Sequence, residues 1–472
     1  MPNNRIEDHP EFKRAAAAGQ AHLFAFYNSL TADEQAALVR DAQRIDYDLM
    51  KRLHREIGGQ EIALPSADEL DAPPVIALPT TDADRKRDDD ARNVGEAALR
   101  AGRVAAFLVS GGQGSRLGFE GPKGAFPVGP VTERTLFEIF ALKIRAIRKR
   151  YGCALPWLIM TSETNHDETV AFFESHRYFS LGKDSIRFFN QEMIPAMSAD
   201  GKLLLSEKHQ LFLSPNGHGG SIKALWDSGS IEFLSQQKID TLFYFQVDNP
   251  LVKIGDPVYI GHHLNSKSDM SLKVVKKTSP FDKSGNPAIH KGKMIMIEYS
   301  DMPESLATLR DSDGELKFRS GSIAIHLFNV GFLERLNRGG FQLPYHRALK
   351  SIPYINERGE KITPEEKNGI KFETFVFDAL PLADRTLVVE TSAYDEFSPV
   401  KNKSGGSSPE TSRKDMSRLA AHWLRNAGIN VPVDSDGYPP AYIELSPETS
   451  LSGEGLERFK STAIDYTRPV RL

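Results

Sequence analysis

Short apolar runs alternate with segments of helical spacing through the middle of the chain. The apolar runs, which predict buried strands, are Val104–Val109, Trp157–Thr161, Ile186–Asn190, Leu242–Val247, Met270–Val275 and Met294–Glu298. The segments of helical spacing are Thr135–Arg150, His166–Phe173, Gly220–Gln236 and Pro257–Asn265. This alternation is typical of a mostly parallel sheet with helices on both faces. We therefore expect an α/β fold whose ligands bind beyond the carboxyl ends of the strands.

Different patterns flank this core. Residues 13–57 are rich in Ala, Leu, Glu and Arg at near-helical spacing, which predicts a helical N-terminal segment. Four prolines interrupt residues 63–81, so we expect a linker or a packed loop there. The charged run at residues 82–92 predicts the exposed start of a helix that ends near Gly102.

The C-terminal side is less regular. Residues 403–412 are rich in Gly and Ser and predict a flexible loop, and the residues beyond them indicate a small C-terminal unit. The patterns divide the chain into a helical N-terminal segment (1–101), a central α/β domain (102–390) and a C-terminal segment (391–472). A chain of 472 residues is long enough for about two to three domains.

Composition excludes several classes of protein. The chain is 40% hydrophobic and 26% charged, as in ordinary globular proteins, and its net charge of −4 gives no general attraction to nucleic acid or a membrane surface. Its apolar stretches are shorter than the roughly 20 residues that span a bilayer, and its polar start lacks a secretion-type apolar region. With Cys153 as its one cysteine, it forms no internal disulfide. We expect a cytoplasmic protein with no obligate protein partner.

A glycine-rich loop follows the first apolar run. Gly111, Gly112 and Gly114 lack side chains, so backbone N–H groups in this loop can approach a phosphate chain closely. Arg116 and Lys123 add positive charge to the same segment. We therefore expect a binding site for a polyanion such as a nucleoside triphosphate. A mobile surface turn is the alternative, but a strand precedes the loop and a helix follows it.

Two common glycine-rich motifs do not fit this loop. A phosphate-binding loop of the Walker A type needs Lys followed by Ser or Thr directly after its second Gly, and that pair is absent. The dinucleotide fingerprint fails because Leu117 stands where its third Gly belongs. The spacing therefore argues against a nicotinamide-dependent oxidoreductase.

A carboxylate stands where another core strand ends. Asp248 follows the run Leu242–Val247, where it could hold a Mg²⁺ ion that bridges phosphate oxygens. Alternatively, Asp248 and Asn249 only cap the loop before Pro250. The glycine-rich loop at the same edge of the sheet favours the metal interpretation.

Other candidates are weaker when each is read alone. The turn Gly217–Gly220 opens a helix, and its backbone could approach a base or a sugar; His218 within it could meet a sugar hydroxyl or solvent. Phe375 and Phe377 alternate as on one face of a strand, which is more typical of a core than of a ligand platform. Lys401 lies in a loop, where a lysine is usually solvated.

Together these segments resemble the eukaryotic-type UDP-N-acetylhexosamine pyrophosphorylases, within the wider family of UTP-dependent uridylyltransferases. The resemblance runs from about Ala18 to Asn426. The stretches that carry it are Ala18–Leu23, Ser110–Gly118, Pro122–Gly124, Pro156–Ser162, Gln191–Met197, Gln246–Lys253, Ile297–Ser300, Asn368–Asp378 and Glu396–Asn402. It implies a Rossmann-like nucleotidyltransferase domain that makes UDP-sugar and pyrophosphate from UTP and a sugar 1-phosphate, with N-acetylglucosamine 1-phosphate the expected sugar substrate.

The resemblance also implies roles for individual residues. On the nucleotide side, these are Gly111, Gly112, Gly114, Gln191 and Gly217. Arg116 and Lys123 would bind the UTP phosphates, Lys401 would bind the phosphate of the sugar substrate, and Asp248 would hold Mg²⁺. On the sugar side, the residues are Gly285, Glu298, Phe375 and Phe377.

Two positions depart from the family pattern. His218 stands where N-acetylhexosamine enzymes typically carry Asn in G-N-G-G, and Ser322 stands where they carry Asn in G-N-I-A. Both positions would touch the sugar. A G-H-G turn is similar to that of UDP-glucose and broad UDP-sugar pyrophosphorylases, so a UTP–glucose-1-phosphate uridylyltransferase or a broad enzyme is the alternative. A non-catalytic nucleotide-sugar binder is a third hypothesis, which the presence of the expected cations and carboxylate disfavours.

Overall fold

The structure is a computed structural model that describes residues 6–57 and 64–472. The backbone forms two compact units, each assembled from three stretches of the chain. Unit 1 contains the described residues up to Leu64, Gln191–Lys223 and Gln342–Asp378, and unit 2 contains Pro65–Asn190, Ala224–Phe341 and Ala379–Leu472. The division of the chain at residues 101 and 390 stays a prediction.

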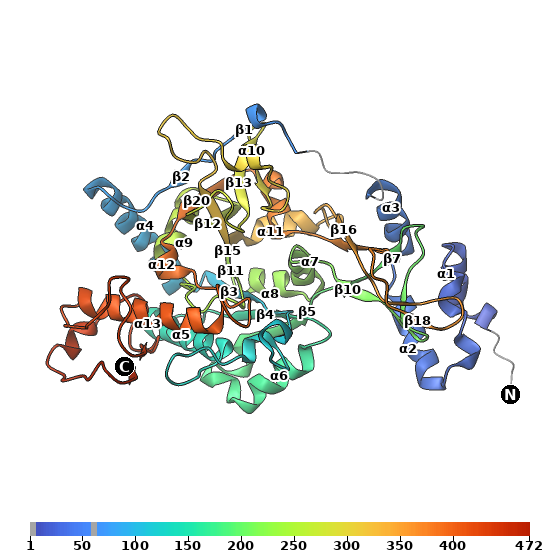
Figure 1. The fold of residues 1–472 in the computed structure, drawn as a ribbon, viewed down its shortest axis with the longest axis horizontal. Helices are drawn as coiled ribbons and strands as arrows, with labels where there is room; N and C mark the ends of the chain where they lie inside the picture. Colours follow the sequence, from blue (N-terminus) through green and yellow to red (C-terminus); the bar gives the residue numbers. More distant parts are fainter. Residues whose placement is uncertain (1–5, 58–63) are drawn as a thin grey trace. The chain divides into compact units, whose positions relative to one another are not determined.

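Unit 2 is built on an eight-stranded sheet, which runs through the centre of Figure 1. Its strands, in spatial order, are β2 (Val75–Ile76), β20 (Thr386–Glu390), β12 (Met270–Lys276), β15 (Ser320–Asn329), β11 (Thr241–Gln246), β3 (Val104–Val109), β4 (Trp157–Thr161) and β5 (Ile186–Asn190). Only β15 pairs antiparallel with its neighbours in this sheet, and the other pairings are parallel. The mostly parallel α/β fold is therefore confirmed.

Helices cover this sheet, which explains its continuous apolar strands. On one face, alternate residues of β3, such as Ala106 and Leu108, share a core with helices α4 (Asp82–Arg100), α5 (Leu136–Tyr151), α6 (His166–Ser175) and α9 (Pro257–Asn265). On the other face, Phe107 of β3 packs against the rings of Phe189 and Tyr244. Further helices of this unit are α8 (Ser230–Gln236), α10 (Glu304–Ala307) and α11 (Val330–Asn337).

Helices α4 and α9 approach each other closely. A Cβ added at Gly95 would lie 1.9 Å from the carbonyl oxygen of Pro257, and one added at Gly261 would lie 1.7 Å from that of Ala91. Backbone therefore packs on backbone at this crossing, which only glycine permits. None of the described helices is both long and apolar enough to cross a membrane.

Several predicted elements differ from the structure. The run Met294–Glu298 does form a strand, β14 (Lys293–Ile297), but it pairs with β13 (Asn286–His290), which also pairs with β1 (Leu70–Asp71), in a separate antiparallel sheet. The predicted helix Gly220–Gln236 is two helices, α7 (Gly220–Asp227) and α8, because Gly229 between them adopts a left-handed φ of 68°.

Two predicted loops hold regular structure. In the segment 63–81, residue 63 lies outside the described residues, and the rest contributes β1 and β2 to two sheets, so it is a packed segment. In the segment 403–412, helix α13 (Pro409–Asn426) already begins, because Ser408 caps it and a proline at its first position suits a helix start.

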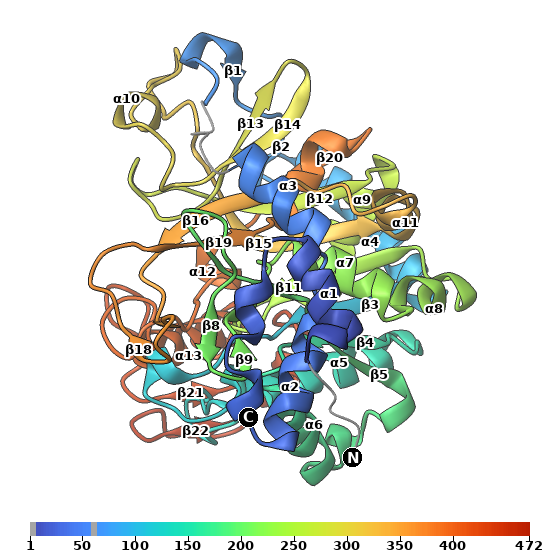
Figure 2. The ribbon, with the colours of Figure 1, turned by 90° about the vertical axis from the view of Figure 1, so that its right-hand side faces the viewer.

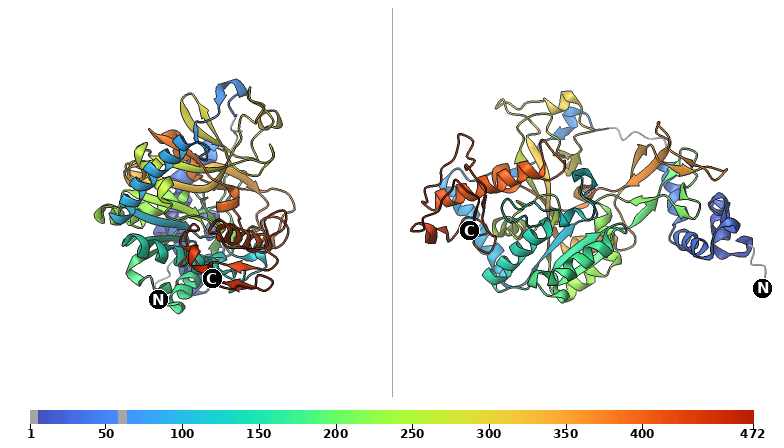
Figure 3. Two further views of the ribbon diagram at one scale, coloured as in Figure 1. Left: turned by 90° about the vertical axis from the view of Figure 1, so that its left-hand side faces the viewer. Right: turned by 60° about the horizontal axis from the view of Figure 1, so that its bottom comes forward.

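The C-terminal part of unit 2 has its own small core. Helix α13, which is orange-red in Figure 3, packs there with the paired strands β21 (Ile443–Glu444) and β22 (Val470–Arg471). The short helix α12 (Ala393–Glu396) precedes α13. The expected small C-terminal unit is therefore present as part of unit 2.

Unit 1 joins the N-terminal helices to short strands. The helices, visible in Figure 2, are α1 (Pro10–Ala17), α2 (Ala32–Gln43) and α3 (Tyr47–Ile57), as the helical spacing predicts. The strands are β6 (Met193–Pro195), β7 (Met197–Ser198), β8 (Leu205–Glu207), β9 (Gln210–Leu211), β10 (Leu213–Pro215), β16 (His346–Lys350), β17 (Tyr354–Ile355), β18 (Lys361–Ile362) and β19 (Gly369–Glu373). Apolar residues from both sets form one core.

Candidate functional site

The glycine-rich loop of unit 2 leaves the end of β3 and is held there by hydrogen bonds. The backbone N–H of Ser110 donates to the carbonyl of Met160 on the adjacent strand (2.8 Å). The buried Asn165 donates from Nδ2 to the carbonyls of Ser110 (2.9 Å) and Gly112 (3.2 Å). The backbone N–H of Lys123 also donates to the Gly112 carbonyl (3.1 Å), which closes the loop on itself. Sequence reasoning did not identify Asn165, because nothing in its local pattern marks it.

The glycines of this loop are required for different reasons. A Cβ added at Gly114 would lie 2.7 Å from Cδ1 of Phe119, so this glycine is required for internal packing. Gly118 has a left-handed φ of 71°. A Cβ added at Gly112 would meet none of the described atoms within 4 Å, and this residue is exposed. The open space at Gly112 is therefore available to a ligand that approaches the backbone.

Two cations of the loop lack protein partners. Neither the Arg116 guanidinium nor the Lys123 ammonium has a hydrogen-bond or ion-pair partner among the described residues. Arg116 is exposed, whereas Lys123 is half-buried. Burial lowers the pKa of Lys123, Asp248 acts in the opposite direction, and the positive charges of Lys401 and Arg116 lower it further. A bound anion would relieve this accumulation of positive charge.

Asp248 and Lys401 lie beside this loop. The Lys401 Nζ atom is 4.0 Å from Oδ2 of Asp248, and their side chains are 52% and 14% exposed, respectively. The backbone holds the two segments together, because the N–H of Val400 donates to the Asp248 carbonyl (2.7 Å). Lys123 thus lies near Asp248 and two further cations, Arg116 and Lys401, an excess of positive charge that suits a polyanionic ligand.

Asp248 is the carboxylate available to a metal here. Among the described residues, no group of three or more His, Cys, Asp or Glu side chains could hold a metal ion. Mg²⁺ usually keeps several waters and is bound by one or two carboxylates together with substrate phosphates. The single carboxylate therefore fits a Mg²⁺ ion that arrives with a triphosphate, and does not fit a metal caged by protein ligands alone.

A second group of predicted residues lies together elsewhere in unit 2. The N–H of Ser322 on β15 donates to the carbonyl of Gly285 (2.8 Å). A Cβ added at Gly285 would lie 2.8 Å from Sδ of Met296 and 3.4 Å from Oε1 of Glu298. Gly285, Glu298 and Ser322 are therefore neighbours, although the sequence brings them from three separate segments.

Unit 1 contains the remaining predicted residues. Gln191, the first residue of its second stretch, is buried. Gly217 has a φ of 81°, and a Cβ added there would lie 2.3 Å from the carbonyl oxygen of Thr374. The sequence suggested that a base or a sugar approaches the backbone at Gly217. In the structure, the backbone of Thr374 lies against this glycine.

His218, Phe375 and Phe377 form a ring cluster in unit 1. The two phenylalanine rings stack 5.1 Å apart, and the His218 ring lies 5.4 Å from each of them. The prediction that Phe375 and Phe377 alternate on one face of a strand is wrong. Strand β19 ends at Glu373, and a 3-10 helix begins at Val376. Alternation over six residues did not distinguish a strand from this strand end and helical turn.

The protonation of His218 follows from its contacts. The backbone N–H of Val376 donates to Nδ1 of His218 (3.1 Å), so Nδ1 is unprotonated and Nε2 carries the hydrogen. Burial lowers the pKa of His218 to about 4. The ring is therefore neutral near pH 7 and presents an Nε2–H donor, as the amide of an asparagine would.

Sequence reasoning missed two residues that contact the ring cluster, His346 and Asp378. The His346 ring lies 4.7 Å from that of Phe375, and its Nε2 is 2.8 Å from Oδ2 of Asp378. The same carboxylate oxygen accepts a hydrogen bond from the N–H of Phe375 (3.3 Å). Asp378 ends one of the stretches that carry the family resemblance, so the sequence could have identified it as a candidate. His346 lies outside every such stretch.

The comparisons with known proteins agree over most of the chain. A protein-family model described as UTP–glucose-1-phosphate uridylyltransferase matches residues 56–406. The UDP-N-acetylglucosamine pyrophosphorylase of Saccharomyces cerevisiae is 34% identical, with 95% of this chain and 96% of that protein covered. The UDP-N-acetylhexosamine pyrophosphorylase-like protein 1 of Xenopus tropicalis is also 34% identical, with 95% and 93% covered.

Solved structures show the same fold. A protein from Entamoeba histolytica, described as a candidate UDP-N-acetylglucosamine pyrophosphorylase, has a TM-score of 0.73 and 32% identity, and the match covers 84% of this chain and 98% of that one. The corresponding enzyme of Trypanosoma brucei has a TM-score of 0.80 over 98% of this chain and 97% of that one. At 24% identity, this second likeness concerns the fold alone.

Proposed function

The chain belongs to the UTP–glucose-1-phosphate uridylyltransferase family, and we propose that it transfers the uridylyl group of UTP to N-acetylglucosamine 1-phosphate. The products are UDP-N-acetylglucosamine and pyrophosphate. The observation that carries the proposal is the group formed by Lys123, Arg116, Lys401 and Asp248, in which Lys123 and Arg116 have no protein partners among the described residues, beside the open backbone at Gly112. The single cysteine agrees with a cytoplasmic location, which forms part of the proposal.

The reaction needs charge stabilisation more than acid–base chemistry. The attacking atom is an oxygen of the sugar phosphate, which is already anionic at pH 7, so no general base is required. The main obstacle is repulsion between this phosphate and the triphosphate. Arg116 and Lys123 would bind the phosphates of UTP, and Lys401 would hold the sugar phosphate for in-line attack on the α-phosphorus.

Asp248 is the residue that would hold Mg²⁺. When bound there, the ion would neutralise part of the phosphate charge. Lys401, 4.0 Å from Asp248, is close enough for the sugar phosphate and the metal-bound nucleotide to be held by adjacent side chains. The structure thus supports a role for this pair in bringing the two substrates together.

The identity of the sugar rests on the relatives and on two side chains. One relative is named a UDP-N-acetylglucosamine pyrophosphorylase and another a UDP-N-acetylhexosamine pyrophosphorylase-like protein, and each match covers nearly the whole chain. His218 preserves an N–H donor at a position where these enzymes typically carry Asn. Ser322 is shorter than Asn but keeps a polar hydroxyl, and its backbone N–H donates to the carbonyl of Gly285. Both substitutions therefore retain polar groups that a sugar could use.

Pyrophosphate release with UTP, Mg²⁺ and a panel of sugar 1-phosphates tests the proposal. The panel contains N-acetylglucosamine, N-acetylgalactosamine, glucose and galactose 1-phosphates. We expect the highest kcat/KM for N-acetylglucosamine 1-phosphate. A preference for glucose or galactose would support the second candidate, a UTP–glucose-1-phosphate or broad UDP-sugar enzyme, which the G-H-G turn and Ser322 favour.

The variant His218→Asn/Ser322→Asn is the matched control for this panel, because it restores both family residues. If the two positions determine specificity, its ratio of kcat/KM for N-acetylglucosamine over glucose 1-phosphate rises above that of the wild type. Release of pyrophosphate with none of the four sugars would contradict the proposal and would favour a nucleotide-sugar binder.

A further inference from the structure

A buried charge cluster lies in unit 2 among residues to which the proposed reaction assigns no role. Lys273 of β12 is 2% exposed, and its Nζ lies 2.6 and 2.8 Å from the carboxylate oxygens of Glu396 and 2.7 Å from Oδ2 of Asp256. Glu396 is completely buried and also accepts hydrogen bonds from the N–H of Lys253 (3.1 Å) and the hydroxyl of Thr391 (2.9 Å). Every oxygen of the Glu396 carboxylate is therefore engaged.

The neighbours of Lys273 stabilise its positive charge. Burial disfavours the charge on Lys273, but attraction to Asp256 and Glu396 raises the pKa of its ammonium above the ordinary value. The Lys273 ammonium also lies 5.1 Å from the centre of the Tyr259 ring. Buried ion pairs of this kind often contribute less to stability than well-packed apolar residues of the same size would. A contribution to stability alone thus gives a weak account of why charges are buried here.

The cluster is connected to Asp248 and Lys401 through Asn249. Nδ2 of Asn249 donates to the backbone carbonyl of Glu396 (2.7 Å), and Oδ1 of Asn249 accepts from the N–H of Ser398 (3.1 Å). Asn249 is itself 4% exposed. The Val400 N–H donates to the Asp248 carbonyl. Three hydrogen bonds therefore join the turn that carries Asp248 to the segment that carries Lys401, and Glu396 anchors one end of that segment to the sheet.

We propose that Glu396, anchored by Lys273 and linked through Asn249, is a positioning residue that sets the distance between Lys401 and Asp248. The inference rests on the proposed function, because that function assigns the sugar phosphate to Lys401. Glu396 itself is buried and touches no substrate. Its effect on the reaction passes through the backbone of residues 396–401, whose shift by about 1 Å would cost on the order of 10²-fold in rate.

The variant Glu396→Gln tests the inference directly. It keeps the size of the side chain and removes the charge that holds Lys273. We expect kcat/KM for the sugar 1-phosphate to fall about 10- to 100-fold, whereas the dissociation constant of UTP stays within about twofold. Asp256→Asn is the matched control, because it removes the other carboxylate of Lys273 without touching residues 396–400, and its kcat/KM should stay within about threefold of the wild type.

A double-mutant cycle with Lys401→Ala separates positioning from a general structural role. If Glu396 acts through Lys401, the variant Glu396→Gln changes kcat/KM less than about twofold once Lys401 is absent. If Glu396 acts on the fold as a whole, its effect is the same in both backgrounds. An undiminished effect in the Lys401→Ala background, or unchanged kcat/KM in a folded Glu396→Gln single variant, overturns the inference.

A third variant keeps the test decisive if Glu396→Gln does not fold. The combination Lys273→Met/Glu396→Leu/Asp256→Asn replaces the three charged side chains by neutral ones of similar size, and we expect it to fold. Its kcat/KM should still be lowered at least tenfold, and a wild-type value overturns the inference. A wild type that releases no pyrophosphate overturns the proposed function and this inference together. If the wild type is active and the cluster variants keep its kcat/KM, the inference alone is overturned.

Discussion

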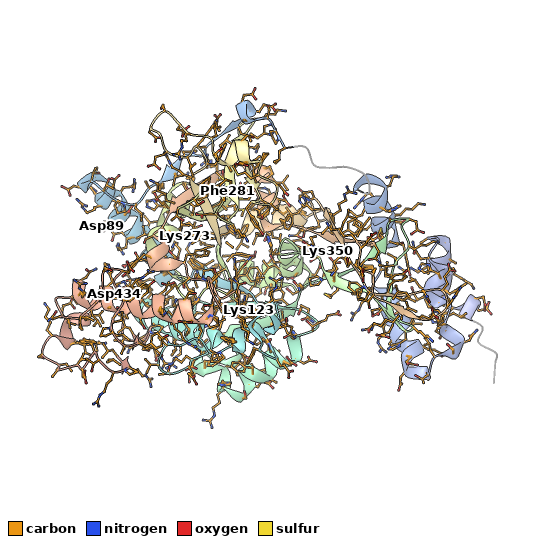
Figure 4. The ribbon with its side chains drawn as sticks, in the orientation of Figure 1. Asp89, Lys123, Lys273, Phe281, Lys350 and Asp434 are labelled. Atoms are coloured by element: carbon orange, nitrogen blue, oxygen red, sulfur yellow. The ribbon has the colours of Figure 1, made fainter. Side chains whose placement is uncertain are left out.

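Two groups of lysines and carboxylates in unit 2 illustrate opposite uses of charge. Around Lys273, one cation meets two carboxylates at 2.6–2.8 Å, and the lysine is 2% exposed. Near Lys123 lie two further cations, Arg116 and Lys401, and one carboxylate, Asp248, and the ion pair between Lys401 and Asp248 spans 4.0 Å. Figure 4 labels both Lys123 and Lys273. The first group is satisfied by the protein, whereas the second has unused charge.

This difference indicates which charges are available to a ligand. A buried cation whose hydrogen bonds are all made by the protein has no capacity left for a substrate, so its role is to hold segments in place. A cation that the fold leaves without a partner in a positive region gains most when an anion binds. A lysine can therefore either hold segments of the protein in place or bind an anionic ligand. The predictions below separate these two roles, from the largest expected effect to the smallest.

The first prediction concerns stability. Lys273→Met leaves Glu396 and Asp256 buried without their cation, and we expect it to lower the free energy of unfolding by about 3–5 kcal/mol. Lys123→Met removes a cation that has no partner, and we expect a change below about 0.5 kcal/mol. Urea denaturation of both variants measures the contrast. Equal losses of stability in the two variants would remove the basis of the comparison.

The second prediction concerns turnover, which depends on the cations that would contact the substrate. Lys123→Ala and Arg116→Ala should each lower kcat roughly 10²-fold or more, the size expected when one partner of the charge in the transition state is lost. Their melting temperatures should match the wild type. Steady-state pyrophosphate release gives kcat, and near-normal turnover in both variants would contradict the assignment.

The third prediction compares two glycines of the same loop. Gly112→Ala should fold with wild-type stability, because the added methyl group meets no described atom, but it should raise KM for UTP about tenfold by filling space that the nucleotide needs. Gly114→Ala should instead lower stability by about 1–3 kcal/mol, because the methyl group would lie 2.7 Å from Phe119. Wild-type KM for UTP in Gly112→Ala would show that this space is not used.

The smallest effect is expected from His218, whose neutral ring in unit 1 contributes no charge at all. Burial lowers its pKa to about 4 from an ordinary value of 6.5. Between these values the unfolded chain binds more protons, so the stability associated with the neutral ring is complete above pH 6.5 and is lost as pH falls through 4.

Allowing for partial solvent exposure of the ring, we expect this loss to be about 1 kcal/mol. His218→Asn should remove that part of the pH dependence between pH 6.5 and 4 in urea denaturation. Identical profiles for the variant and the wild type would show that His218 titrates normally. His263, whose pKa burial also lowers to about 4, titrates in both proteins and cancels in the difference.

The local parts of this site could be predicted from the sequence. The strand β3, its glycine-rich loop and the two cations follow one another within about 20 residues, so the apolar run and the glycine spacing were sufficient. Asp248 was predictable for the same reason, because a carboxylate directly after an apolar strand lies at the ligand edge of a parallel sheet. Lys401 was not, because only a tertiary contact joins it to Asp248, and the resemblance alone singled it out.

The missed features depend on pairing between distant segments. β14 has the pattern of a strand, but only its pairing with β13 places it outside the main sheet. Lys273 interrupts an apolar strand, a pattern that signals a buried and paired lysine, yet its partner Glu396 cannot be found from spacing. The sequence therefore singled out the residues of the proposed site more readily than the residues that hold them in position.

The most direct test of the central claim is ³¹P NMR of a mixture of wild-type protein, UTP, N-acetylglucosamine 1-phosphate and Mg²⁺. The account predicts that the resonances of both substrates decline together while those of pyrophosphate and of a UDP-sugar diphosphate grow in equal amounts, and that Lys123→Ala abolishes the change on the same timescale. Broadened UTP resonances without any product would show that the unpaired cations bind nucleotide without transferring it, and would contradict the account.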